Sequence, residues 1–130
     1  MIKAVFFDFY GVININSKLN REIAEFIQLN NNKYLFAVLS AAQGDLHDWL
    51  ITHGINDYFA LVQTTSKVGI EKSDQRFYQL AIRLLELQPQ EVVFIDDARE
   101  YTQIARGVGM HTINYKSDMN FSQQVKGLIV

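Results

Sequence analysis

Five reactive side chains stand where apolar runs of the sequence stop or where a helical pattern is about to begin: Asp8, Ser40, Lys72, Asp96 and Asp97. Each one alone has an ordinary structural explanation, as a helix cap, a surface lysine or a polar turn. Together they supply carboxylates, a hydroxyl and an ammonium. Magnesium prefers carboxylate oxygens together with phosphate oxygens, while lysine and hydroxyl groups hold phosphate oxygens. The set therefore predicts a site for phosphate chemistry with Mg²⁺.

The elements that must position these side chains are short strands alternating with amphipathic helices. Apolar runs predict strands at residues 3–8, 34–40, 61–65, 91–96 and 111–115. Nearly continuous apolar runs are typical of strands buried on both faces of a parallel sheet. The alternation predicts an α/β fold with a doubly wound, Rossmann-like, five-stranded parallel sheet, whose carboxyl edge would collect all five side chains. If Asp8 and Asp97 are neighbours, right-handed crossovers predict the strand order 3-2-1-4-5.

The predicted helices carry end signals of their own. Ile23, Phe26 and Ile27 recur at helical spacing in the first amphipathic stretch. Gly54 is the expected C-terminal cap of the next helix, and Ser73 is the expected N-terminal cap of the helix after Lys72. No repeat or linker interrupts the pattern, so we expect one domain over residues 1–130.

Composition excludes several classes of protein. The chain is 48% hydrophobic, has a formal net charge of −2 and contains no cysteine. Disulfides and thiolate metal sites are therefore excluded, and no basic stripe predicts binding of nucleic acid. The apolar N-terminal stretch is broken at Asp8, too early for a signal peptide or a membrane span. A cytoplasmic protein is the expectation.

The order of these motifs resembles that of the haloacid dehalogenase-like (HAD) hydrolase superfamily. The four motifs of that family correspond here to FFDFYGV, AVLSAA, VGIEKSDQRFYQLA and VVFIDDAREYTQIARGVGM. The last of them resembles the subgroup whose motif reads Phe-Ile-Asp-Asp. The resemblance covers essentially the whole chain. It implies a HAD-like core domain that hydrolyses phosphoesters with Mg²⁺.

The resemblance also implies roles for individual residues in phosphoryl transfer. Asp8 would be the nucleophile that attacks phosphorus and becomes a phospho-aspartate. Ser40, Ala41 and Lys72 would bind the transferring phosphoryl group.

The same resemblance implies a metal site. Asp8, the backbone carbonyl of Tyr10, Asp96 and Asp97 would hold Mg²⁺. Asp97 is the expected direct ligand of the acid pair, because it matches the acid that binds metal directly in the commoner Gly-Asp form of the motif.

Tyr10 is the main departure from the family pattern. In most family phosphatases this position is an aspartate that protonates the leaving group and then activates water. Tyrosine ordinarily keeps its proton at neutral pH, so it can donate a proton but is a poor base. We therefore expect a slow phosphatase. Lesser departures are Ser73, where proline is usual, and Tyr101, where asparagine is usual.

Two other functions remain open at this point. One is a catalytically weakened domain that binds phosphate or a protein partner. The other, ranked lower, is a 2-haloacid dehalogenase, since those enzymes also read Asp-x-Tyr-Gly. They attack carbon without a metal and use a helical cap, whereas residues 13–39 are expected to hold one helix and one strand. Without metal, Asp96 and Asp97 would also repel a haloacid carboxylate.

The expected lack of a cap bears on substrates and partners. A cap closes over small metabolites and excludes water. A bare core leaves an open site, which favours a bulky or macromolecular phosphorylated substrate. The same opening would suit a homo-oligomer in which a neighbouring copy acts as the lid.

Overall fold

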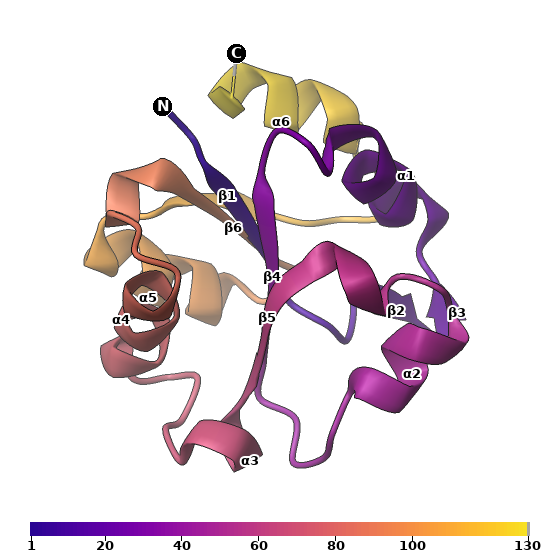
Figure 1. Cartoon of the computed structure of the whole chain (residues 1–130). Helices are drawn as coiled ribbons and strands as arrows, with labels where there is room; N and C mark the ends of the chain where they lie inside the picture. The colour runs from indigo at the N-terminus through magenta and orange to yellow at the C-terminus, as the bar shows by residue number, and fades with distance from the viewer. Residues whose placement is uncertain (130) are drawn as a thin grey trace.

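A five-stranded parallel sheet forms the centre of the chain in a computed structural model that describes residues 1–129 (Figure 1). Its spatial order is β5-β4-β1-β6-β7, and every neighbouring pair is parallel. In chain order these strands are β1 Ala4–Phe7, β4 Leu35–Ser40, β5 Phe59–Thr64, β6 Val92–Asp96 and β7 His111–Asn114. The order is therefore 3-2-1-4-5 with the first strand central, which confirms the predicted fold.

Helices cover both faces of the sheet. Helices α4 (Gln75–Leu84) and α5 (Arg99–Val108) lie on one face, and α1 (Arg21–Asn30), α2 (His47–Thr52) and α6 (Phe121–Ile129) lie on the other (Figure 1). Each helical layer packs against one face of the sheet, and alternate residues of the strands point to opposite faces.

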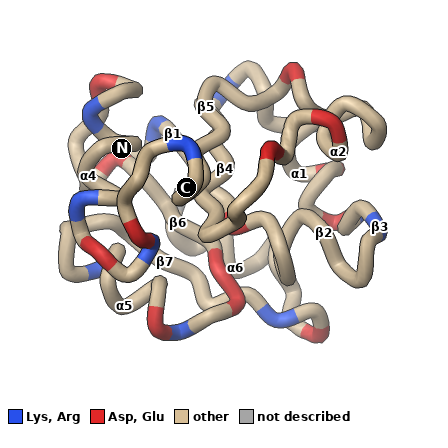
Figure 2. The backbone as a smooth tube through the Cα atoms, turned by 90° about the horizontal axis from the view of Figure 1, so that it is seen from below, with Lys and Arg blue, Asp and Glu red and all other residues tan. Residues whose placement is uncertain are grey.

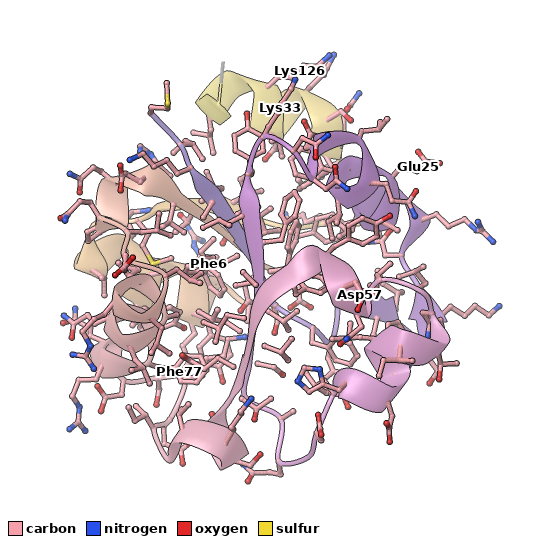
Figure 3. The ribbon with its side chains drawn as sticks, in the orientation of Figure 1. Phe6, Glu25, Lys33, Asp57, Phe77 and Lys126 are labelled. Carbon is pink, nitrogen blue, oxygen red and sulfur yellow. The ribbon has the colours of Figure 1, made fainter. Side chains whose placement is uncertain are left out.

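The alternation is clear in β1, whose four residues are all buried. Phe6 packs with Phe77 of α4 (Figure 3), whereas Phe7 packs in the cluster that contains Ile23 of α1 and Phe121 of α6. Successive side chains of a strand point to opposite faces, so β1 contributes to both cores at once. Burial on both faces explains why its sequence is a continuous apolar run.

A β-hairpin follows β1 and differs from the expectation that residues 13–39 hold only one helix and one strand. Strand β2 (Asn14–Ile15) pairs with β3 (Lys18–Leu19) in antiparallel fashion. The two turn residues, Asn16 and Ser17, have φ angles of 52° and 69°. Two successive left-handed residues are typical of the tight turns that join antiparallel strands. Among residues 1–129, only this hairpin and α1 lie between β1 and β4, and no cap domain is inserted there.

Short elements complete the chain and were also not predicted. They are a single-turn helix α3 (Thr65–Val68) and two 3₁₀ turns, η1 (Asn56–Tyr58) and η2 (Pro89–Glu91). Each is too short to show a hydrophobic period of its own.

The predicted helix ends are partly correct. Gly54 has φ +74° and its N–H donates to the carbonyl of Ile51, as a C-terminal cap does. The prediction for Ser73 is wrong, because the cap of α4 is Asp74, whose side chain accepts from the N–H of Arg76. The same carboxylate also pairs with the guanidinium of Arg76, a bond that a serine hydroxyl could not make as a charge pair.

Charged residues are spread over the surface of the described chain. Figure 2 shows acidic and basic residues interspersed along helices and loops, in keeping with the small net charge. None of the helices within residues 1–129 combines the length and apolarity that a membrane crossing needs.

Candidate active site

The pairing of β1 with β6 brings the first two acids together. Phe7 is opposite Ile95 in this pair, so Asp8 and Asp96 are the next residues at the same edge of the sheet. The N–H of Asp8 donates to the carbonyl of Ile95 over 2.8 Å, which fixes the backbone at the point where the strand ends. Both side chains are buried.

A tight turn after Asp8 leaves space for the side chain of the third acid, Asp97. The carbonyl of Phe9 accepts the N–H groups of Ile13 and Asn14, each over 2.9 Å, and the carbonyl of Tyr10 takes no part in this turn. Gly11 has φ +89°, and a Cβ built on it would overlap the carboxylate of Asp97, with Cγ only 2.6 Å away. Only glycine combines this backbone conformation with the space that Asp97 needs.

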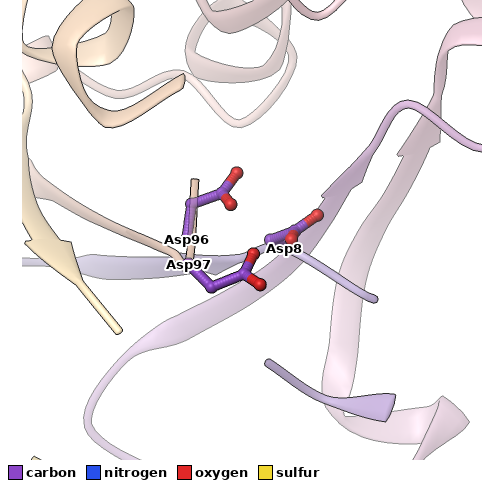
Figure 4. Close-up of side chains that lie close together, drawn as sticks. All are labelled: Asp8, Asp96 and Asp97. Atoms are coloured by element: carbon purple, nitrogen blue, oxygen red, sulfur yellow. The ribbon is translucent and has the colours of Figure 1, made fainter. Parts of the chain in front are cut away.

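The three acids form a cluster suited to a divalent cation. Asp8, Asp96 and Asp97 each offer a carboxylate oxygen, and these oxygens lie within 4.8 Å of one another (Figure 4). Asp96 is fully buried; its Oδ1 accepts from the N–H of Ala98 over 2.9 Å, and its Oδ2 makes no hydrogen bond. Three converging carboxylates are a set of hard oxygen donors, and the exposed carboxylate of Asp97 lines the pocket, which together fit Mg²⁺.

Lys72 reaches this cluster from the loop between α3 and α4. Its Nζ donates a hydrogen bond to Asp8 Oδ1 over 2.6 Å. The same Nζ lies 2.8 Å from Asp96 Oδ2 and forms an ion pair with it, without the geometry of a hydrogen bond. Only 2% of its side chain is exposed. The rings of Tyr101 and Phe94 lie 4.5 and 5.6 Å from Nζ, so aromatic faces shield the ammonium on its other sides.

The crowding of acids changes their ionisation. Burial raises the pKa of Asp8 from its ordinary value near 3.8 to about 7; the ammonium of Lys72 opposes this rise and the neighbouring Asp96 adds to it. Burial, and then the Asp96 carboxyl, also raise the pKa of Asp97. Three carboxylates held this close repel each other, and a cation would relieve that repulsion.

One pocket of about 460 Å³ is lined by every residue that the sequence predicts for the site: Asp8, Tyr10, Ser40, Ala41, Lys72, Asp96 and Asp97. Ser40 is the last residue of β4, and its buried Oγ accepts from the N–H of Ala42 over 3.1 Å. The structure thus brings together residues that are up to 89 positions apart in sequence, because the carboxyl ends of parallel strands meet at one edge of the sheet.

Four further residues line the same pocket and were not predicted as part of the site: Ala42, Gln43, Ala98 and Tyr101. Ala42 and Ala98 lie two residues beyond the strand-end residues Ser40 and Asp96, and their N–H groups donate to those two side chains. Their position after a strand was the available signal, but alanine carries no chemistry of its own. Tyr101 lies on α5 and faces the pocket from the side of Lys72.

A family model described as "Haloacid dehalogenase-like hydrolase" matches residues 3–115. Among curated proteins, the chain is 32% identical over 71 residues to acyl-CoA dehydrogenase family member 10 of Mus musculus. It is 34% identical over 59 residues to bifunctional epoxide hydrolase 2 of Sus scrofa. These matches cover 55% and 45% of this chain but only 7% and 11% of the two much longer relatives.

Solved structures share the fold over nearly the whole chain. A HAD family enzyme of Bacteroides thetaiotaomicron, in complex with magnesium and inorganic phosphate, aligns with a TM-score of 0.80 at 14% identity and covers 95% of this chain and 99% of that one. A HAD-superfamily hydrolase of Geobacter sulfurreducens aligns with a TM-score of 0.81 at 14% identity, with 92% of each chain covered. The core domain of a putative phosphoglycolate phosphatase of Streptococcus pneumoniae gives a TM-score of 0.76 at 12% identity, with 97% and 94% covered.

Proposed function

Because the chain belongs to the haloacid dehalogenase-like hydrolase family, we propose that it is a magnesium-dependent phosphatase that works through a phospho-aspartate on Asp8. One observation carries this proposal. Asp8, Asp96 and Asp97 converge within 4.8 Å, while buried Lys72 bridges Asp8 and Asp96 at 2.6 and 2.8 Å. Such an arrangement offers a nucleophilic carboxylate beside a fixed positive charge in one pocket.

In the first step, Asp8 is the nucleophile. Lys72 holds its Oδ1, so Oδ2 is the oxygen that attacks phosphorus. A bond forms between Oδ2 and phosphorus, and the bond between phosphorus and the leaving oxygen breaks with its electron pair. Lys72, Ser40 and the backbone at Ala41 bind the phosphoryl oxygens, whose negative charge the ammonium offsets.

In the second step, water releases the phosphate. Its oxygen attacks the phosphorus of phospho-Asp8, the bond to the carboxylate oxygen breaks, and inorganic phosphate leaves. A base should take the proton from this water, and Tyr10 holds the position where an aspartate would do so. Because a protonated phenol is a poor base, this step should be the slower one.

The metal would be held by Asp8, the backbone carbonyl of Tyr10, Asp96 and Asp97. Mg²⁺ at this position would offset the charge of the carboxylates and of the phosphoryl oxygens. Asp97 is exposed, whereas Asp96 is fully buried and already engaged by Lys72 and Ala98, which favours Asp97 as the direct ligand of the pair. The structural neighbour from Bacteroides thetaiotaomicron, which binds magnesium and inorganic phosphate, supports the proposal of a magnesium and phosphate site here.

Trapping of the phospho-enzyme tests the proposal. The chain is incubated with acetyl phosphate or an aryl phosphate, with Mg²⁺ or with a chelator, and phospho-Asp8 is measured by mass spectrometry. We expect a single phosphoryl group that needs Mg²⁺ and disappears in Asp8→Asn. Asp57→Asn changes an exposed acid of η1, away from the pocket, and serves as the matched control.

The alternative is a domain that binds phosphate or a protein partner without turnover. Tyr10 in the place of the base is the observation that favours it. This alternative replaces the phosphatase if the wild-type chain is never phosphorylated under any of these conditions and yet binds inorganic phosphate in the presence of Mg²⁺.

A further inference from the structure

We propose that the substrates of this site are aryl phosphomonoesters, and that the rings of Tyr10 and Tyr101 hold the aryl group. This inference rests on the proposed function, since the phosphoryl group occupies the same subsite. It names the chemistry of the leaving group. Three independent features of the pocket lead to it: an exposed ring at its mouth, a second ring beside Lys72, and uncharged remaining walls.

The first feature is the ring of Tyr10. Its residue is 59% exposed, although the neighbouring nucleophile, Asp8, is only 7% exposed. The ring packs against an aromatic neighbour, because Phe9 meets it edge-on at 4.8 Å and Trp49 meets Phe9 edge-on at 4.9 Å. An ordered aromatic face at the mouth of a pocket is available to stack on another ring.

The second feature is the ring of Tyr101. It is half-buried in the pocket wall, with its centroid 4.5 Å from Nζ of Lys72. Lys72 Nζ lies over one face of this ring, and Tyr101 lines the same pocket as Asp8 and Tyr10, so the rest of its surface is available to the group that the phosphoryl oxygen carries. An aryl group offers Tyr101 a flat apolar surface, whereas a short alkyl chain offers little.

The third feature is the lack of charge on the rest of the lining. Apart from Lys72 and the three acids, the described residues that line this pocket are two tyrosines, three alanines, a serine and a glutamine. None of these offers a charge to a second phosphate or a carboxylate on the substrate. A neutral, flat leaving group fits this wall better than a polyanion.

The chemistry of Tyr10 points in the same direction. When Asp8 attacks, the leaving oxygen takes the electron pair of its bond to phosphorus and must then be protonated. A phenol gives up its proton far more readily than an aliphatic alcohol, whose pKa lies close to that of water. A phenolate therefore departs without a strong acid beside it, and an alkoxide does not. With tyrosine in place of the carboxylic acid, the site is suited to the better leaving group.

Binding of two phosphonates tests the inference without any turnover. Phenylphosphonate and ethylphosphonate are titrated into the full chain with Mg²⁺, by calorimetry or NMR. We expect wild type to bind phenylphosphonate at least tenfold more tightly, and Tyr10→Ala and Tyr101→Ala each to reduce that ratio by roughly 2- to 12-fold, the value of one aromatic pair. Tyr10→Phe should keep the preference. Tyr34→Ala alters a partly buried tyrosine at the opposite end of β4 and is the control.

Turnover supplies the second readout. Phenyl phosphate is compared with ethyl phosphate, and a phosphotyrosyl peptide with the matched phosphoseryl peptide. We expect the aryl member of each pair to be preferred and the preference to shrink in Tyr10→Ala. The two peptide substrates separate a protein-borne aryl phosphate from a free one.

The outcomes separate this inference from the proposed function. Equal binding of both phosphonates by wild type overturns the aryl site, even if phospho-Asp8 forms. A preference that survives in Tyr10→Ala, Tyr10→Leu and Tyr101→Ala overturns the assignment of the rings; circular dichroism of each variant shows that it is folded. If the phenyl preference holds but no phospho-Asp8 forms with any substrate, the phosphatase fails and the aryl site stands.

Discussion

Lys72 and the two acids that it touches show how a single charge organises the pocket floor. Removing one partner of a buried ion pair leaves an uncompensated charge, which costs several kcal/mol, whereas an exposed pair contributes little. The ammonium is 2% exposed and has two carboxylates within 2.8 Å. One positive charge cannot neutralise two buried carboxylates. Burial therefore outweighs the effect of Lys72, and the pKa of Asp8 rises to about 7.

This raised pKa predicts a pH-dependent stability of the metal-free protein. Below pH about 4, Asp8 is protonated in both the folded and the unfolded chain. Between pH about 4 and 7, the unfolded chain releases this proton while the folded chain keeps it, so the contribution of Asp8 to the free energy of unfolding falls as pH rises. Asp8→Asn cannot ionise. Its stability relative to wild type should therefore be greater at pH 7.5 than at pH 4.5, by on the order of 1–4 kcal/mol.

Urea unfolding in a chelator, at pH values from 4.5 to 8, measures this difference. Asp57→Asn should follow the wild-type curve at every pH. Parallel curves for Asp8→Asn and wild type would show that Asp8 ionises alike in the folded and unfolded chains, which would contradict a raised pKa of this carboxyl in the folded protein.

Tyr10 gives the second prediction at this scale. Tyr10→Asp places a carboxylate base beside the attacking water, and general base catalysis contributes roughly 10²–10⁴-fold. We expect phospho-Asp8 of this variant to disappear faster than that of wild type by about this factor. Single-turnover decay of the trapped phospho-enzyme is the measurement.

Tyr10→Asn is the matched control for this substitution, because it has the size of aspartate but no basic oxygen. Its phospho-enzyme should persist. If wild type turns over briskly and Tyr10→Asp is no faster, another group acts as the base and Tyr10 has been assigned the wrong role.

Single residues differ in how well the sequence revealed them. Asp8, Ser40 and Asp96 were predictable, because the end of a buried strand is visible as the end of an apolar run. The approach of Asp97 to Gly11 was not, since it depends on a turn geometry that no periodicity encodes. Ser73 was assigned to a cap from residue type alone, and the adjacent aspartate, which bonds both the N–H and the guanidinium of Arg76, took that position.

At the scale of elements, length explains what was predictable. Strands of four or more residues and helices of six or more appear in the sequence as periodic or continuous apolar patterns, and their order then determines the sheet. Strands β2 and β3 have two residues each, too few for a period of two to be seen. Their turn, Asn16-Ser17, also lacks the Asn-Gly or Asp-Gly pair that usually signals a tight hairpin.

The hairpin is tied to the rest of the fold by Asn20. This residue precedes α1, where an asparagine usually caps the helix, yet its side chain makes no capping bond. Its Nδ2 donates instead to the carbonyl of Val12 and to the hydroxyl of Tyr115, each over 2.8 Å. Tyr115 in turn donates to Glu22 over 3.0 Å. The turn after Asp8 is thus linked, through Asn20, to Tyr115, the residue after β7, and through Tyr115 to Glu22 of α1.

Asn20→Ala tests this connection. Loss of two partly buried hydrogen bonds, with the carbonyl of Val12 left without this donor, should lower the free energy of unfolding by about 1–3 kcal/mol. Because Val12 lies in the turn that follows Asp8, we also expect weaker phosphorylation of Asp8. Chemical denaturation and phospho-enzyme yield are the two measurements.

Asn32→Ala, in the exposed turn after α1, is the control and should change neither quantity. Wild-type stability in Asn20→Ala would mean that water replaces both bonds and that the hairpin is held by its own turn.

At the scale of the whole molecule, two cores on opposite faces of one sheet hold the acids at a shared edge. The sheet must bring β1 and β6 together to bury Phe6, Phe7, Phe94 and Ile95, and the same pairing forces Asp8 and Asp96 into contact. Burial of apolar surface therefore provides the free energy that keeps like charges close. The fold therefore holds Asp8, Asp96 and Asp97 close together despite their mutual repulsion, which a bound cation would reduce.

The repulsion among these three carboxylates predicts that Mg²⁺ stabilises the whole domain. A ligand that binds only the folded chain adds about 2.7 kcal/mol at a concentration 100 times its Kd, and a cation needs Asp8, Asp96 and Asp97 in their folded positions. We expect millimolar Mg²⁺ to raise the Tm by several degrees, since each kcal/mol shifts Tm by roughly 2–8 °C in domains near this size. Asp97→Asn should abolish the rise, and Asp57→Asn should retain it. Calorimetry with and without Mg²⁺ decides: a wild-type melting curve that Mg²⁺ does not move would mean that the three carboxylates do not form a magnesium site.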